Sequence, residues 1–273
     1  MEKAKESYDT YNKQLLRGNL MIKSLSGNTL KTIALISMLL DHIGTVIIYP
    51  MYVNACFVDG VDMLGELAPD GAKKLYLIYI LLRIIGRLAF PIFAFMITEG
   101  FSRTHNLKKY FGRLFLFAVI SEIPYNLANG GNVLYLDSQN VLWTFLVALI
   151  MLWAIKKYAY KPANKIMNII ITAIIVCIAA LATILSDGGF GGILLIASMY
   201  LFKKDKKKYW IGCIVSSLIM VRQFMWIQLF AFVALILIKM YDGKRGRGSK
   251  YLFYLSYPVH FLLLTSLSVM LGL

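Results

Sequence analysis

Residues 30–50 read LKTIALISMLLDHIGTVIIYP, an apolar stretch interrupted near its middle by Asp41 and His42. An α-helix needs about 20 consecutive apolar residues to cross the hydrocarbon core of a bilayer. The stretch therefore predicts a transmembrane helix. A charged side chain at that depth costs about 2.5–3.5 kcal/mol and commonly marks a functional site. The Asp-His pair is thus the first candidate for chemistry.

The rest of the chain repeats this apolar pattern. Its 273 residues are 59% hydrophobic and 16% charged, whereas a soluble domain has roughly 25% charged residues. This composition excludes an ordinary soluble enzyme and a disordered chain. We expect an all-α, polytopic integral membrane protein, a single bundle of about nine to ten transmembrane helices. The predicted helices are residues 32–50, 75–101, 110–128, 140–155, 166–185, 189–202, 209–222, 224–239 and 251–271, of which the sixth and seventh are short for a full crossing.

The distribution of basic residues predicts the orientation. The net charge is +15, and 24 of the 29 lysines and arginines lie in residues 1–31, 102–113, 156–165, 203–208 and 239–250. Such clusters between apolar stretches are typical of cytoplasmic loops rather than of a nucleic-acid-binding protein. We expect a multi-pass protein of the cell membrane with a cytoplasmic N-terminus, a C-terminus outside, and no cleaved signal peptide. Residues 1–31 are interpreted as a cytoplasmic amphipathic segment and residues 32–273 as the transmembrane domain.

Eight ionisable residues fall inside the apolar stretches, and their formal charges balance. Balance indicates pairing in a protein-lined interior. Arg83 and Arg87 share a helix face and need anions, either carboxylates or ligand phosphates. Glu122, two residues before Pro124, indicates with Tyr125 a polar opening toward the outer face. The eight are Asp41, His42, Arg83, Arg87, Glu99, Glu122, Arg222 and His260.

Structural roles remain open for several of these residues. Arg83 and Arg222 could extend to the membrane surface, and Glu99 could cap its helix or pair with Arg103. His260 could be a packing residue. His42 is the strongest candidate for proton transfer, because imidazole titrates near neutral pH. Adjacent helical residues point about 100° apart, so Asp41 could orient His42 or a residue on a neighbouring helix. No cluster of cysteine and histidine with metal-site spacing is present, and no metal is expected.

Four ordered segments resemble motifs of the TraX family, which includes the protein that N-acetylates conjugative pilin. They are LKTIALISMLLDHIG at 30–44, RIIGRLAFPIFAFMITEGF at 83–101, FAVISEIPYNLA at 117–128 and YLFYLSYPVHFLLL at 251–264. Lys31 and His42, separated by ten residues, are also similar to a basic-x10-His signature of the wider transmembrane acyltransferase-3 group. Lysine here replaces the usual arginine and lacks its bidentate fork.

The resemblance implies an integral membrane acyltransferase, most simply an acetyltransferase. It implies acetyl-CoA as a cytoplasmic donor, His42 as the catalytic residue, and a peptide, pilin or surface-glycan acceptor. Asp41 would support the imidazolium, and Arg87 would stabilise an oxyanion or anchor a carboxylate. We expect Lys31, Lys108, Lys109 and Arg113 to hold the phosphates of CoA.

Two other functions fit the same residues. Paired charges and proline-broken helices inside a membrane are also found in ion-coupled secondary transporters. A non-catalytic assembly factor for a pilus or secretion system is the third possibility. Release of free CoA would favour the enzyme, and tolerance of His42→Ala would favour the assembly factor.

Overall fold

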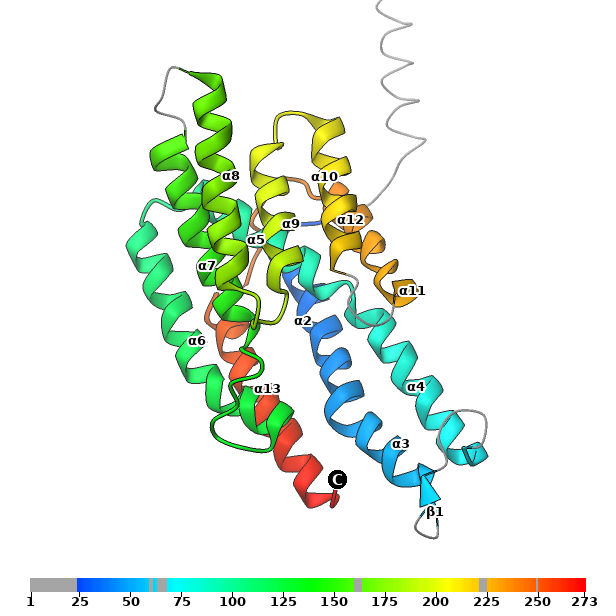
Figure 1. Cartoon of the computed structure of the whole chain (residues 1–273). Helices are drawn as coiled ribbons and strands as arrows, with labels where there is room; N and C mark the ends of the chain where they lie inside the picture. Colours follow the sequence, from blue (N-terminus) through cyan, green and yellow to red (C-terminus); the bar gives the residue numbers. More distant parts are fainter. Residues whose placement is uncertain (1–23, 59–60, 63–67, 160–163, 221–224, 249) are drawn as a thin grey trace, which may run out of the picture.

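The chain folds into a bundle of helices in the computed structural model, which describes residues 24–58, 61–62, 68–159, 164–220, 225–248 and 250–273 (Figure 1). The all-α class is confirmed. Within these ranges two strands of two residues each form a single hairpin. The elements are α2 (Gly27–Ile43), η1 (Gly44–Ile48, a π-helix), α3 (Tyr49–Cys56), β1 (Phe57–Val58), β2 (Val61–Asp62), α4 (Asp70–Gly86), α5 (Ala89–Arg103), α6 (Leu107–Gly130), α7 (Val141–Ala154), η3 (Ile155–Ala159, a π-helix), α8 (Lys165–Ala182), α9 (Gly189–Leu201), α10 (Lys206–Ile219), α11 (Met225–Gln228), α12 (Ala231–Lys239) and α13 (Lys250–Met270).

The first helix starts and bends at places set by its sequence. Ser26 caps α2, because its hydroxyl accepts a hydrogen bond from the Thr29 N–H at 3.2 Å. Ser is a preferred N-cap because its side chain satisfies an amide that has no partner in the first turn. Two residues after His42 the backbone widens into the π-helix η1. Such wide turns often occur at functional sites.

The second apolar stretch is broken between α4 and α5. Pro91 has no N–H to bond the carbonyl of Arg87, and its ring crowds that carbonyl. The regular helix accordingly ends at Gly86 and resumes at Ala89. α4 and α5 both pack against α2. The break therefore places Arg83 and Arg87 beside the last turn of α2.

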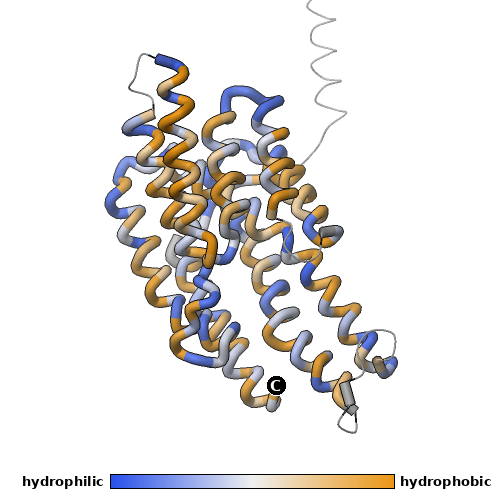
Figure 2. Tube along the Cα trace, viewed as in Figure 1, coloured by the Kyte–Doolittle hydropathy of each residue, from blue (hydrophilic) through white to orange (hydrophobic). Residues whose placement is uncertain are grey.

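The predicted helical segments are found, but nine crossings are not confirmed. Within the described ranges, five helical stretches are long and apolar enough to cross a membrane: Gly27–Cys56, Asp70–Arg103, Val141–Ala159, Lys165–Ala182 and Leu252–Met270. α9 has 13 residues, which is about 20 Å of helix against roughly 30 Å of hydrocarbon. Figure 1 shows α9, α10 and α12 confined to the upper half of the view, and Figure 2 shows hydrophobic residues along α8 and α4.

Three of the five predicted cytoplasmic segments contact one another through described residues. The Leu25 and Gly27 amides donate to the carbonyls of Met240 and Lys244 at 2.9 and 2.8 Å. Arg103 donates to the Gly243 carbonyl at 2.7 Å. We call this part of the bundle the basic end. Its side of the membrane remains a prediction from the charge pattern.

Glu99 holds the basic end together. Its side chain is 9% exposed and accepts from Arg103 Nε at 2.8 Å and Lys203 Nζ at 2.6 Å. It thereby joins α5 to the turn between α9 and α10. Of the alternatives open from the sequence, pairing with Arg103 is the one observed, and Lys203 is an additional partner.

Glu99→Gln is expected to lower the free energy of unfolding by about 1–3 kcal/mol, because two cations lose their shared carboxylate. Both cations are about half exposed, so water limits the loss. The measurement is thermal unfolding in detergent. Asp70→Asn is the control: it removes an exposed ion pair with Lys73 and should change stability by less than about 0.5 kcal/mol. Equal effects of the two substitutions would contradict the role of Glu99.

Candidate active site

Asp41 is bound by two arginines of the neighbouring helix. Arg83 Nη1 donates to Asp41 Oδ2 at 2.5 Å, and Arg87 Nη2 donates to Oδ1 at 2.8 Å. The three side chains are 13–24% exposed. The contact needs Gly86, because a Cβ there would overlap the Asp41 carboxylate. The predicted pairing of the intramembrane charges is therefore observed for this trio, and it leaves one positive charge in excess.

His42 bonds to His260 of α13. The distance from His42 Nδ1 to His260 Nε2 is 2.6 Å, and His260 Nδ1 lies 2.8 Å from the carbonyl oxygen of Ser256. A carbonyl only accepts, so His260 Nδ1 carries a proton, and in the neutral ring Nε2 is then an acceptor. His42 Nδ1 must then donate, which leaves Nε2 of His42 as a free lone pair. The direct Asp41–His42 contact that the sequence left open is not observed, because the arginines occupy the carboxylate.

His42 faces a cavity of about 650 Å³, which we call the histidine cavity. The same cavity is lined by Asp41 of α2 and by Arg83 and Arg87 at the end of α4. Tyr125 of α6 also lines it, and its hydroxyl lies 2.8 Å from Ser138 Oγ. The neutral, singly hydrogen-bonded imidazole thus borders a space large enough for a reacting group.

Two further carboxylates line the histidine cavity, and sequence reasoning missed both. Asp137 precedes α7, and Asp187 lies in the turn between α8 and α9. In the sequence both lie between predicted helices. The turn reaches the cavity because Asp187 is held by α7: its amide donates to the Gln139 carbonyl at 2.8 Å, and its carbonyl accepts from Thr144 Oγ1 at 2.6 Å. In the sequence, the short length of the segment that forms α9 was the signal that the turn before it could lie within the bundle.

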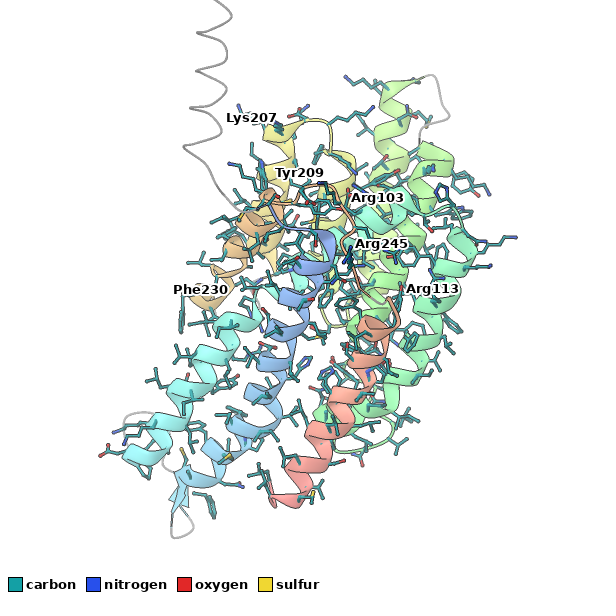
Figure 3. All side chains as sticks on the ribbon, turned by 180° about the vertical axis from the view of Figure 1, so that it is seen from behind. Arg103, Arg113, Lys207, Tyr209, Phe230 and Arg245 are labelled. Carbon is teal, nitrogen blue, oxygen red and sulfur yellow. The ribbon has the colours of Figure 1, made fainter. Side chains whose placement is uncertain are left out.

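A second cavity of about 450 Å³ begins at the basic end, and we call it the basic cavity. Lys31, Arg103, Arg113 and Arg245 line it, together with aromatic residues of α5, α7 and α13. Figure 3 shows the three arginines in the same part of the bundle. Arg113 Nε is buried without a hydrogen-bond partner.

The structure thus separates the basic residues that were expected to contact a donor. Of the four predicted residues, Lys31 and Arg113 line the basic cavity, whereas Lys108 and Lys109 do not. Lys108 and Lys109 are exposed on the first turn of α6. Sequence reasoning did not single out Arg245, because this residue lies in a loop that reaches the start of α2 only when the chain folds back.

The remaining predicted site residues have other surroundings. Glu122 Oε2 accepts from Trp143 Nε1 at 2.7 Å and also from Asn140, so this side chain joins α6 to α7. It does not line either of these two cavities. Arg222 lies outside the described residues. Within the described part of the chain, no group of three or more His, Cys, Asp or Glu side chains could hold a metal ion.

The chain matches a known family over most of its length. The sequence profile of the TraX protein aligns with residues 26–268. The chain belongs to the TraX family. All of the described residues discussed above, apart from Leu25 and Met270 at its margins, lie within that match.

A curated relative of this TraX-family chain is described as "Probable fimbrial assembly protein FimC, serogroup H1", from Dichelobacter nodosus. The two are 27% identical over 263 residues, which cover 87% of this chain and 93% of the relative. No solved structure matches the chain. The resemblance stated from the sequence motifs is confirmed at the level of the family.

Gly86→Ala is expected to destabilise the protein by about 1–3 kcal/mol, because the added methyl group displaces Asp41 from its arginines. Thermal unfolding in detergent measures the change. Gly71→Ala is the matched control on the same helix, since a Cβ there meets nothing within 4 Å. Equal unfolding temperatures for the two variants would be inconsistent with the close contact at Gly86.

Proposed function

We propose that this TraX-family protein is an integral membrane acyltransferase that moves an acetyl group from acetyl-CoA to an acceptor amine or hydroxyl. The observation that carries the proposal is the hydrogen-bonded row from His42 through His260 to the Ser256 carbonyl. It leaves a free imidazole nitrogen on a cavity wall. A fixed tautomer with an exposed lone pair is what a general base requires.

The reaction assigns a step to each group. His42 Nε2 takes a proton from the acceptor as its nitrogen or oxygen attacks the thioester carbonyl carbon. The new bond forms, the carbonyl π electrons move onto oxygen, and the C–S bond breaks when they return. The leaving thiolate takes the proton from His42. His260 accepts a hydrogen bond from His42 throughout and is a positioning residue.

The arginine–aspartate trio would stabilise the negative charge of the tetrahedral intermediate. Arg83 and Arg87 share one carboxylate, so one positive charge remains for an oxyanion beside His42. Fixed cations in a site that excludes water act strongly on a developing charge. Asp41 therefore acts on the arginines and keeps them in place, whereas His42 depends on His260.

The acidic wall of the histidine cavity favours an amine acceptor over a hydroxyl. Asp137 and Asp187 would attract the ammonium form of an amine. An ammonium loses its extra proton before attack, either to water or to one of these carboxylates. His42 then removes the second proton during the reaction. A peptide amine fits this charge pattern better than a neutral glycan.

The donor would bind at the basic cavity. CoA carries several phosphate charges and stays at the membrane surface, while its narrow pantetheine arm can extend inward. Lys31 and His42 are eleven residues apart on one helix, or about 16 Å. Arg113, with an unpartnered buried Nε, and Arg245 are the first candidates for phosphate contacts.

The relative's description supports a second candidate, a non-catalytic assembly factor for fimbriae. On that reading His42 and His260 only hold α2 against α13. The two candidates differ in what a folded His42 variant does. If fimbria-like fibres still assemble, without any acetyl group found on their subunits, the assembly role is favoured.

His42→Ala is expected to lower the rate of acetyl transfer, or of slow acetyl-CoA hydrolysis, by about 10²–10⁴-fold, because the general base is removed. Release of free CoA by purified protein measures the rate. His105→Ala is the control, since His105 is exposed in the loop before α6. Unchanged turnover in folded His42→Ala protein would remove His42 from the mechanism.

Replacing Arg113 and Arg245 with glutamine is expected to raise KM for acetyl-CoA by about 10-fold or more, because charged hydrogen bonds to phosphate contribute about 1.5–3 kcal/mol each. kcat should change little, since the lost binding is the same in the ground and transition states. Salt should then affect KM less. The control pair is Lys108→Gln with Lys109→Gln; a larger effect there would place CoA outside the basic cavity.

A further inference from the structure

The two cavities meet at five side chains. Met38, Phe93, Val141, Phe145 and Tyr257 each line both the histidine cavity and the basic cavity. They come from four different helices, α2, α5, α7 and α13. We call these five residues the collar. Any group that passes from the basic cavity to His42 has to pass the collar.

The collar lies one helical turn from the histidines, on the side of the basic end. Met38 precedes His42 by four residues, and Tyr257 precedes His260 by three, so the separations along the helices are about 6 and about 4.5 Å. The rings of Tyr257 and His260 have centroids 5.5 Å apart. An acyl carbon placed at His42 Nε2 would therefore have its thioester sulfur and the end of the pantetheine arm at the collar.

Most collar side chains are tightly packed. Met38, Val141, Phe145 and Tyr257 are 4–9% exposed. Tyr257 is held by the Val141 amide, which donates to its hydroxyl at 3.4 Å. Phe145 packs against Phe93, with ring centroids 6.4 Å apart. Met38 is the unbranched member, with several rotatable bonds, and can move without displacing a helix.

We infer that the collar selects acyl groups by their width, passing an acetyl group and excluding branched or cyclic ones. This inference rests on the proposed acyltransferase function. The physical reason is that a collar of buried rings cannot widen without moving four packed helices, whereas rotation of Met38 alone frees only a small space. One carbon too many in a tightly packed apolar site changes discrimination by about 10–200-fold.

The test compares acetyl-CoA with isobutyryl-CoA, whose acyl group is branched, in purified full-length protein. Met38→Ala and Phe145→Leu both widen the collar, and Phe145→Leu is the conservative variant should Met38→Ala fail to fold. Each is expected to raise the ratio of kcat/KM for isobutyryl-CoA to that for acetyl-CoA by about 10-fold or more. Release of free CoA and the mass of the acylated acceptor are both measured.

Phe101→Leu is the matched control. Phe101 is 5% exposed, close to the 4% of Phe145, and packs edge-on against Tyr200 with ring centroids 5.6 Å apart. It lines neither cavity. The ratio of the two kcat/KM values in Phe101→Leu should equal that of the wild type. An equal rise in Phe101→Leu would show a general loosening of the bundle and overturn the assignment to the collar.

Two further outcomes separate this inference from the function on which it rests. If the wild-type protein transfers acetyl groups but folded Phe145→Leu and Met38→Ala keep the wild-type ratio, the collar is not the selecting element while the acyltransferase function stands. If the wild type releases CoA from neither thioester and acylates no acceptor, both the function and the collar inference are wrong.

Discussion

The carboxylate of Asp41 between two guanidinium groups is the contact on which the site depends. It fixes α4 against α2 at the level of His42. A lone carboxylate or a lone arginine at this depth would cost several kcal/mol, so each side needs the other. The pair also requires a glycine at position 86, because the two helices approach too closely there for a side chain. The break before Pro91 brings Arg87 into the same cluster.

A second interaction, between two histidines, decides the chemistry that the site can perform. The Ser256 carbonyl fixes the proton on His260 and thereby the proton on His42. α13 thus acts on α2 although more than 200 residues separate them in the chain. The charged trio and the histidine pair therefore have separate tasks: the first fixes the arginines, and the second orients the imidazole of His42. An aspartate that is neutralised by two arginines does not also orient an imidazole.

The two cavities suggest how a charged donor and a membrane-embedded reaction can coexist. Positively charged side chains line the basic cavity, and carboxylates line the histidine cavity. Between them lies a collar of apolar side chains next to His42. In the proposed enzyme, this arrangement keeps the phosphates at the surface and lets only an uncharged acyl group approach the base.

The sequence alone determined the class of protein, the helical segments, and that the charges within the apolar stretches need partners, because hydropathy and the cost of burying charge act locally along the chain. The motifs around His42, Arg87 and His260 also sufficed to identify the family. Only the tertiary structure decided that Asp41 contacts arginines instead of a histidine, that His260 is the partner of His42, and that Asp187 lies on a cavity wall. These outcomes depend on which helices touch and at what height. A folded-back loop such as that of Arg245 leaves no local trace in the sequence of where it lies in the fold.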